Sequence, residues 1–131
     1  SGIYDVLHIG HLHHLQEAKS YANFLIVEIV DDALAREAKG PGRPVTPVGR
    51  RAELVAALKP VDCVVIVTSM DFKWEVIRMI RPDFYVRGGD YRGREVPERE
   101  LVESLGGVVV FTSSKVESTT DVITRLQEAR P

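Results

Sequence analysis

The stretch that decides the fold of this chain lies close to its start, where residues 2–11 read Gly2-Ile3-Tyr4-Asp5-Val6-Leu7-His8-Ile9-Gly10-His11. Two histidines, His8 and His11, stand three positions apart at the beginning of an expected helix. Gly10 between them has no side chain, so an anion can approach the backbone closely there. The first turn of a helix offers unpaired N–H groups and a dipole that favours anions. Imidazole nitrogens can donate hydrogen bonds and take up positive charge, so the stretch indicates a phosphate-binding turn that opens a helix.

On these residues alone, two other interpretations of the His-x-x-His pair stay open, a helical metal pair and a surface coincidence. A metal site would need further ligands. The single cysteine, Cys63, lies inside an apolar run over residues 61–67, and the two remaining histidines are His13 and His14. A thiol in such a run is typical of core packing. The sequence therefore does not favour zinc, and we assign no residue as a metal ligand.

The composition indicates one globular domain over residues 1–131. Of these residues 44% are hydrophobic, which is enough to bury a core. The 17 Lys and Arg stand against 19 Asp and Glu, a formal charge of −2, so the chain has no overall basic field for nucleic acid. One cysteine excludes a disulfide framework and fits a reducing compartment. There is no apolar run of about 18 residues and no secretory signal pattern, so we expect a cytoplasmic domain without a membrane partner.

Short β-branched runs alternate with amphipathic stretches along the chain. Strands are expected over residues 24–30, 63–67, 84–86 and 108–111, and helices over residues 11–20, 48–58, 73–80, 98–105 and 119–129. Near-continuous apolar strands separated by helices are typical of a parallel sheet that is covered on both faces. The fold class we expect is therefore α/β, a doubly wound, Rossmann-like parallel sheet.

The start of this pattern is irregular. A phosphate-binding turn of this kind follows a strand, yet only three residues precede Tyr4. Either the chain lacks its first strand or that strand is reduced to a stub. In a doubly wound sheet the first strand is central, so its loss would be costly.

Polar and glycine-rich segments recur where strands end or helices begin. They are the loop over residues 39–44, Arg50 and Arg51 at the start of a helix, residues 87–93 after a strand, and residues 118–121, which have the form of a helix N-cap. Taken singly, each is more often structural, because loops are commonly rich in glycine and arginines are commonly solvated. Together they occupy the positions at which doubly wound folds bind ligands.

The motif Gly2-x-Tyr4-Asp5-x-x-His8-x-Gly10-His11 resembles the signature of the cytidylyltransferase-like nucleotidyltransferases. Five further motifs make the chain most similar to the adenylyltransferase domains of bifunctional heptose-phosphate kinase/adenylyltransferases: Lys39-Gly40, Arg43-Pro44, Val61-Asp62, Gly88-Gly89-Asp90-Tyr91 and Ser118-Thr119-Thr120. Glycerol-3-phosphate and ethanolamine-phosphate cytidylyltransferases are the next nearest resemblance. The His-Ile-Gly-His tetrad alone also occurs in class I aminoacyl-tRNA synthetases, but those chains are much longer. Two positions depart from the family pattern: Tyr4 replaces the usual Phe, and Lys115-Val116-Glu117 stands where relatives often carry a glycine.

The resemblance implies transfer of a nucleotidyl group, AMP in the first place, from a nucleoside triphosphate to a small phosphorylated sugar or polyol. Heptose 1-phosphate is the expected acceptor and pyrophosphate the second product. ATP is the favoured nucleotide, and CTP is the alternative that a glycerol-3-phosphate or ethanolamine-phosphate cytidylyltransferase would use. Mg²⁺ is expected, held mainly by phosphate oxygens and water. A catalytically inactive nucleotide-binding module on the same fold is the competing hypothesis.

The resemblance also implies roles for single residues. Four would act on the reacting phosphates: His8, His11, Lys39 and Arg51. Ten would bind the nucleotide: Gly2, Tyr4, Asp5, Gly10, Gly88, Asp90, Tyr91, Ser118, Thr119 and Thr120. For Asp5, contact with the metal ion and a structural role in the N-terminal turn are both open. A homodimer is expected through the region of Val61 and Asp62, unless Asp62 only caps the start of a strand.

Overall fold

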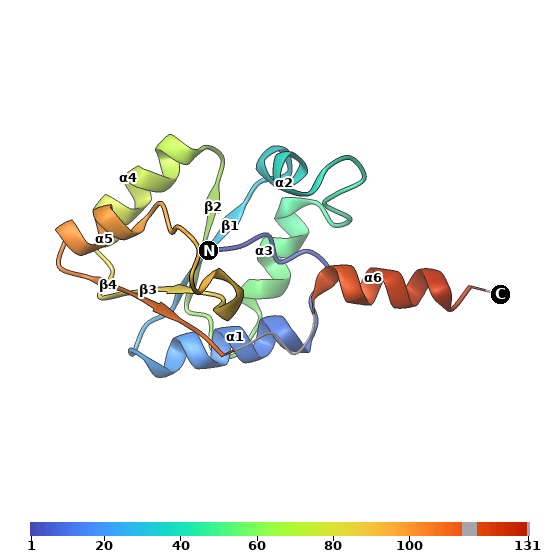
Figure 1. Cartoon of the computed structure of the whole chain (residues 1–131), viewed down its shortest axis with the longest axis horizontal. Helices are drawn as coiled ribbons and strands as arrows, with labels where there is room; N and C mark the ends of the chain where they lie inside the picture. The colour runs from blue at the N-terminus through green and yellow to red at the C-terminus, as the bar shows by residue number, and fades with distance from the viewer. Residues whose placement is uncertain (114–117, 131) are drawn as a thin grey trace.

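The computed structural model describes residues 1–113 and 118–130 of the chain. In sequence order its elements are α1 (Ile9–Ser20), β1 (Ile26–Val30), α2 (Asp32–Lys39), α3 (Val48–Ala56), β2 (Cys63–Val67), α4 (Met70–Ile80), β3 (Phe84–Arg87), the 3-10 helix η1 (Gly89–Tyr91), α5 (Arg99–Ser104), β4 (Val108–Phe111) and α6 (Thr119–Glu128). Strands alternate with helices along the chain (Figure 1), as the sequence predicted.

The strands pair in parallel, which confirms the α/β fold class. β1 pairs with β2 in the register Ile26↔Cys63 to Val30↔Val67. β3 pairs with β4 in the register Phe84↔Val108 to Arg87↔Phe111. In the part of the chain that the structure describes, these strands form two separate two-stranded sheets, where the sequence had led us to expect one continuous sheet.

The residues before Tyr4 pair with β1 at one position. Gly2 forms a single parallel bridge to Ile29. Its N–H donates to the Glu28 carbonyl at 3.0 Å, and its carbonyl accepts from the Val30 N–H at 3.1 Å. Beyond this bridge a cavity of about 270 Å³ lies between β1 and β3. One bridge is too short to join the two sheets into one ladder, so the sheet is divided.

Each sheet has its own apolar core. In the first half, Tyr4, Leu15, Val27, Ile29 and Val55 form one buried cluster. In the second half, a smaller cluster gathers Ile77, Tyr85 and Val102. Two modest cores in place of one large core follow from the division of the sheet, because each pair of strands buries its own face.

The helix α2 was not expected from the sequence. The sequence predicted no element between the strand that ends at residue 30 and the loop that begins at residue 39. In the structure the Asp31 carboxylate caps α2 by accepting the Leu34 N–H at 2.9 Å. The Asp31 cap and the amphipathic pattern of residues 32–39 were signals for this helix that the sequence prediction did not use.

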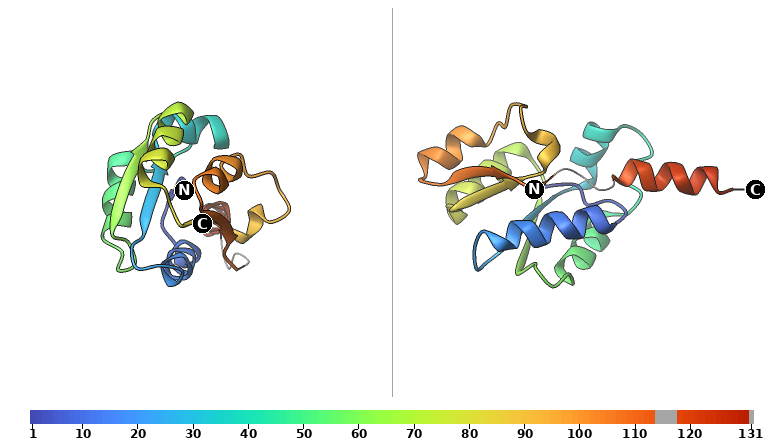
Figure 2. Two further views of the ribbon diagram at one scale, coloured as in Figure 1. Left: turned by 90° about the vertical axis from the view of Figure 1, so that its left-hand side faces the viewer. Right: turned by 60° about the horizontal axis from the view of Figure 1, so that its bottom comes forward.

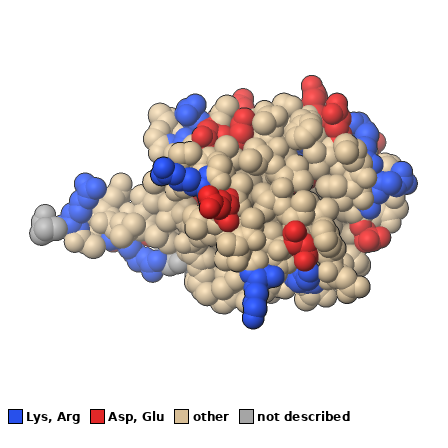
Figure 3. All heavy atoms as spheres, turned by 180° about the vertical axis from the view of Figure 1, so that it is seen from behind, with Lys and Arg blue, Asp and Glu red and all other residues tan. Residues whose placement is uncertain are grey.

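The last helix, α6, extends away from the rest of the molecule (Figure 2). None of its described residues is buried, and Leu126 is 63% exposed. Acidic and basic side chains are scattered over the face seen in Figure 3 and do not gather into a large patch of one sign. Among the helices of the described residues, none is long and apolar enough to span a bilayer.

Candidate active site

His8 and His11 form one compact unit at the start of α1. His8 has an extended backbone and is the N-cap residue, and its Nδ1 accepts a hydrogen bond from the Gly10 N–H at 3.1 Å. His11 Nδ1 accepts the His8 N–H at 3.3 Å, which completes a reciprocal capping box. The two rings stack with centroids 3.9 Å apart. The expected turn at the start of a helix is therefore present, and its histidines cap that helix. Its binding of phosphates stays a prediction.

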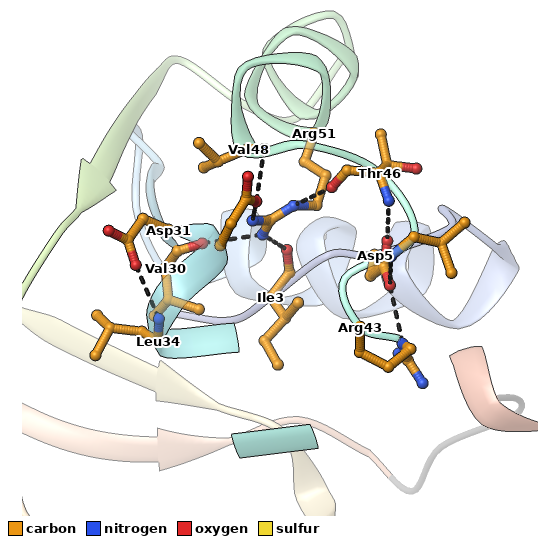
Figure 4. A network of polar contacts seen from close by, with 11 residues as sticks. Ile3, Asp5, Val30, Asp31, Leu34, Arg43, Thr46, Val48 and Arg51 are labelled. Carbon is orange, nitrogen blue, oxygen red and sulfur yellow. Dashed lines mark hydrogen bonds and ion pairs between the residues drawn. The ribbon is translucent and has the colours of Figure 1, made fainter. Parts of the chain in front are cut away.

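The turn before this helix is held in a strained backbone conformation. Tyr4 and Val6 have φ values of 53° and 49°, in the left-handed region that side chains other than glycine rarely adopt. Between them Asp5 is only 1% exposed. Its carboxylate accepts hydrogen bonds from the N–H groups of Val45 (2.8 Å) and Thr46 (3.0 Å) (Figure 4). A turn under this strain must be over-determined by its surroundings, and Asp5 supplies much of that support.

Arg43 adds an ion pair to the same carboxylate, with its Nε 3.0 Å from Asp5 Oδ2. Burial alone would raise the pKa of Asp5, but the hydrogen bonds from Val45, Thr46 and Arg43 outweigh it and hold the pKa below its usual value. Of the two roles that the sequence left open, the structure gives Asp5 the contacts of the structural one. The carboxylate fastens the loop of residues 43–46 to the N-terminal turn.

The Tyr4 ring lies beside the ring of His11, and Gly2 packs against the Tyr4 ring. Tyr4 is 5% exposed, and its ring centroid lies 5.3 Å from that of His11. Burial raises the pKa of the Tyr4 hydroxyl. A Cβ atom added at Gly2 would lie 2.9 Å from Tyr4 Cε2, so a larger residue would push this ring. Both residues therefore lie behind the site and support His11.

Arg51 is buried, with 1% of its surface exposed, and its guanidinium is surrounded by protein acceptors (Figure 4). Its Nε donates to the Thr46 carbonyl at 2.8 Å. One terminal nitrogen donates to the carbonyls of Ile3 (2.6 Å) and Val30 (2.9 Å), and the other pairs with Asp32 Oδ1 at 2.7 Å. The expected contact of Arg51 with phosphates is revised accordingly, because these bonds would have to open first. Arg51 joins the N-terminal turn to β1, α2 and the loop before α3.

Lys39 lies apart from this network. It is the last residue of α2 and is exposed, and Gly40 ends the helix with a φ of 90°. The loop that follows Gly40 returns to the site at Arg43, whose side chain reaches Asp5. The Lys39–Gly40 and Arg43–Pro44 motifs therefore lie at the two ends of one loop. Only the second end touches the N-terminal turn.

Residues 88–91 lie at the end of β3, where the 3-10 helix η1 turns back against the segment after β4. The Tyr91 N–H donates to the Gly88 carbonyl at 2.9 Å, and the Arg87 guanidinium lies 4.0 Å from the Tyr91 ring centroid. A Cβ atom at Gly89 would lie 2.8 Å from the Ser113 carbonyl oxygen, so this close approach requires glycine. A cavity of about 330 Å³ opens here, lined by Glu17, Gly89, Arg92, Thr112 and Ser113.

The Ser-Thr-Thr segment begins α6 beside the start of α1. Ser118 is the N-cap of α6, and its hydroxyl accepts the Asp121 N–H at 3.1 Å. The Thr119 hydroxyl donates to the Asp5 carbonyl at 2.6 Å, and Thr120 is exposed in the first turn. The start of α6 thus lies against residue 5, three residues before the N-cap of α1. A helix start carries a positive dipole end, which favours anions. The unusual Lys115-Val116-Glu117 sequence lies outside the described residues.

The contacts between α1 and the end of β4 were not expected from the sequence. His14 Nδ1 lies 2.9 Å from the Thr112 hydroxyl, and the Glu17 carboxylate accepts the Ser113 N–H at 2.9 Å. The available signal was that His14 follows His11 by three positions and so continues the same face of α1. Thr112 carried no comparable signal, since its partner is 98 positions away.

Among the described residues, no group of three His, Cys, Asp or Glu side chains is arranged to hold a metal ion. The buried Asp5 carboxylate already accepts three hydrogen bonds. A metal ion at Asp5 would compete with these hydrogen bonds.

Comparisons with known proteins agree with this geometry. A cytidylyltransferase-like family model matches residues 1–125. The chain is 39% identical to the bifunctional protein HldE of a Nitratiruptor species, over 97% of the chain and 27% of that protein. It is 42% identical to the bifunctional protein HldE of Sulfurimonas denitrificans, over 97% of the chain and 26% of that protein. The chain thus spans about a quarter of the length of these curated relatives.

A solved structure shares the fold as well. The crystal structure of the lipopolysaccharide core biosynthesis protein from Thermoplasma volcanium aligns with a TM-score of 0.74 and 28% sequence identity, covering 88% of this chain and 93% of that one. The resemblance carried by the His-Ile-Gly-His motif is thereby confirmed. With its parallel strands, its histidine-capped helix and a family match over residues 1–125, the chain belongs to the cytidylyltransferase-like family.

Proposed function

We propose that this chain transfers AMP from ATP to the phosphate group of a small phosphorylated sugar, heptose 1-phosphate in the first place. A phosphate oxygen of the acceptor forms a bond to the α-phosphorus of ATP. The bond from that phosphorus to the oxygen bridging to the β-phosphate breaks, and pyrophosphate leaves with the electron pair. The observation that carries the proposal is the hydrogen bond from Thr119 to Asp5, which brings the hydroxyl groups at the start of α6 to the turn that leads into the histidine pair of α1.

The roles of the residues follow from their places. His8 and His11 face the reacting phosphates and stabilise the charge that spreads over them in the transition state. Gly10 leaves the first turn of α1 open to the α-phosphate. Ser118 and Thr119 hold the β- or γ-phosphate at the start of α6, together with Thr120. Lys39, which lies exposed at the end of α2, is assigned to the opposite side of the phosphates on the family resemblance and not on its place in the structure.

The remaining residues bind the nucleoside or support the site. Gly88, Asp90 and Tyr91 contact the nucleotide at the end of β3. Arg51, Asp5, Tyr4 and Gly2 act from behind the site by fixing the turn that leads to His8. Mg²⁺, held by phosphate oxygens, supplies further charge neutralisation when it is bound.

The choice of substrates is supported by the relatives. The curated proteins that match over nearly the whole chain are named bifunctional HldE proteins, and the sequence motifs resemble their adenylyltransferase region. This likeness favours ATP over CTP and a heptose phosphate over glycerol 3-phosphate or ethanolamine phosphate. A cytoplasmic site of action is part of the same proposal, since phosphorylated sugars and ATP are cytoplasmic substrates.

Pyrophosphate release tests the proposal directly. The full chain is incubated with Mg²⁺ and either ATP or CTP, each with heptose 1-phosphate, glycerol 3-phosphate or ethanolamine phosphate. We expect release only with ATP and the sugar phosphate. Tighter binding of CTP in calorimetric titration, together with CTP-dependent release, would overturn the nucleotide assignment. Binding of ATP without release from any pair would show an inactive nucleotide-binding module instead.

A homodimer is a further part of the proposal, and the structure changes how it is tested. The Asp62 carboxylate contacts Lys19 Nζ and accepts the Leu25 N–H at 2.8 Å. These contacts are those of a cap at the start of β2, so a substitution at Asp62 would disturb the chain itself. Light scattering at micromolar concentration is the cleaner test. A mass near twice the 14.6 kDa of the chain supports the dimer, and a mass near 14.6 kDa contradicts it.

A further inference from the structure

Two side chains of α1 hold the segment that follows β4. His14 Nδ1 lies 2.9 Å from the Thr112 hydroxyl. One turn later, the Glu17 carboxylate accepts the Ser113 N–H at 2.9 and 3.1 Å and the Ser113 hydroxyl at 3.2 Å. We call these four residues the α1–β4 clamp. It ties the helix that carries the histidine pair to the strand that precedes α6.

Thr112 is the buried part of the clamp, so its hydroxyl needs a hydrogen-bonding partner inside the protein. Thr112 is 3% exposed, and its N–H donates to the Arg87 carbonyl at 3.0 Å. Its hydroxyl pairs with His14 and would otherwise be a buried polar group at an energetic cost. The Glu17 half lies at the surface, where a carboxylate that accepts a backbone N–H forms a charge-assisted bond.

The clamp also supports η1, the 3-10 helix to which the proposed function assigns nucleotide contacts. The backbone at Gly89 packs directly on the carbonyls of Thr112 and Ser113. A shift of Thr112 away from α1 would therefore move η1 and the residues around Gly89.

We propose that His14 and Glu17 are positioning residues that set where η1 and the end of β4 stand relative to the His8–His11 pair. The inference rests on the proposed function, since it assigns the clamp to the nucleotide side of that site. His14 and Glu17 need not touch the substrate to act in this way. They act through Thr112, Ser113 and Gly89.

The electrostatics suit a fixed contact at neutral pH. Burial is the largest cause that lowers the pKa of His14, to about 4, and Arg87 acts in the same direction, against the raising effects of Glu17 and Asp90. The ring is therefore neutral near pH 7 and can pair with a hydroxyl without a charge to compensate. Acidification toward pH 4 would charge the ring and disfavour this buried position.

A double-mutant cycle on His14 and Thr112 tests the proposal. The variants are His14→Leu, Thr112→Val and the pair, with His14→Asn and Thr112→Ser as conservative replacements that keep a hydrogen-bonding group. His13→Leu is the matched control, because His13 is an exposed neighbour on the same helix. For each variant, KM and kcat for pyrophosphate release, the dissociation constant for ATP and the unfolding midpoint are measured.

We expect either single substitution to raise KM for the triphosphate about tenfold, which corresponds to about 1.4 kcal/mol, with kcat changed less than about threefold. The double variant should be no worse than the single ones, as is typical of residues that act through one contact. His14→Asn and Thr112→Ser should recover most of the loss, and His13→Leu should match the parent chain.

Three results would overturn the clamp. One is a set of additive effects on KM, and another is an equal loss in the conservative variants. The third is a lower unfolding midpoint with an unchanged KM, because a merely structural contact would behave in that way. If the parent chain releases no pyrophosphate, the proposed function fails by itself. The ATP dissociation constants of the variants are then compared in place of KM, and the same three results would contradict the role of the clamp.

Discussion

The hydroxyl of Thr119 donates a hydrogen bond of 2.6 Å to the carbonyl oxygen of Asp5, across 114 positions of the chain. This contact places the start of α6 beside the turn that leads into α1 (Figure 1). Both helix starts carry the positive end of a helix dipole. Under the proposed function, a triphosphate that spans them would meet both dipoles at once.

Replacing Arg51 by Met should destabilise the chain by about 3 kcal/mol, because the carbonyls of Ile3, Val30 and Thr46 lose their donor. The Asp32 carboxylate, whose side chain is 39% exposed, adds less, because water can replace its partner. Arg51→Lys should recover little of this loss, because an ammonium group cannot reproduce the planar fork that reaches Ile3, Thr46 and Asp32 together. Urea unfolding followed by circular dichroism measures both variants.

Arg50 is the matched control for that experiment, since it is the preceding residue and is exposed. Arg50→Met should change the free energy of unfolding by less than about 0.5 kcal/mol. If Arg51→Met were as stable as Arg50→Met yet lost activity, Arg51 would regain the phosphate contact that the sequence first suggested.

Asp5→Asn should lower the stability at pH 7 by about 3 kcal/mol, because an amide cannot accept three hydrogen bonds as a carboxylate does. The pH dependence has a defined sign. The folded-state pKa of Asp5 lies below its usual value of 3.8, so its stabilisation is present above that pH and is lost as the pH falls below it. The stability difference between the parent chain and Asp5→Asn should therefore shrink below about pH 3.8. A difference that stays constant from about pH 7 to about pH 2 would refute the assignment.

Gly89→Ala should destabilise the chain by about 1–3 kcal/mol and weaken nucleotide binding, because the new methyl group would press on the backbone of Thr112 and Ser113. Gly49→Ala is its control. Gly49 lies in α3 with open space around its Cβ position, so alanine should be neutral or stabilising there. Thermal unfolding and ATP titration compare the two, and equal behaviour would contradict the close approach at Gly89.

The sequence was most informative where structure is decided locally. The His8–His11 turn and the Ser118 cap are set by residues within one helical turn, and both were predicted. The role of Arg51 was not, because its burial depends on Ile3, Val30 and Asp32 meeting it from three other segments. Local pattern predicts a cap well, but it says little about which arginine ends in the interior.

The division of the sheet into two pairs of strands could not be predicted from the sequence either. Strand lengths follow from apolar runs, so residues 63–67 and 108–111 were predicted with the bounds that the structure shows. Whether β1 and β3 share a ladder depends on what lies between them. In the described residues that is one bridge at Gly2 and a cavity.

The histidine pair can be tested without disturbing the helix that it caps. Alanine at His8 would remove both the imidazole and the cap, and losing the cap costs about 1 kcal/mol. Asparagine is a good N-cap residue, so His8→Asn keeps the cap and removes the ring. Glutamine at position 11 keeps the reciprocal partner of the capping box, so His11→Gln removes the second ring in the same way.

The most direct test of the account is the rate of pyrophosphate release from ATP and heptose 1-phosphate by the parent chain, His8→Asn and His11→Gln. The account predicts that either substitution lowers kcat at least about a hundredfold, as is typical of losing one preorganised group that stabilises transition-state charge. The dissociation constant for ATP and the unfolding midpoint should change little. A near-normal kcat in either variant would contradict the assignment of that histidine to catalysis, and a near-normal kcat in both would refute the proposed mechanism.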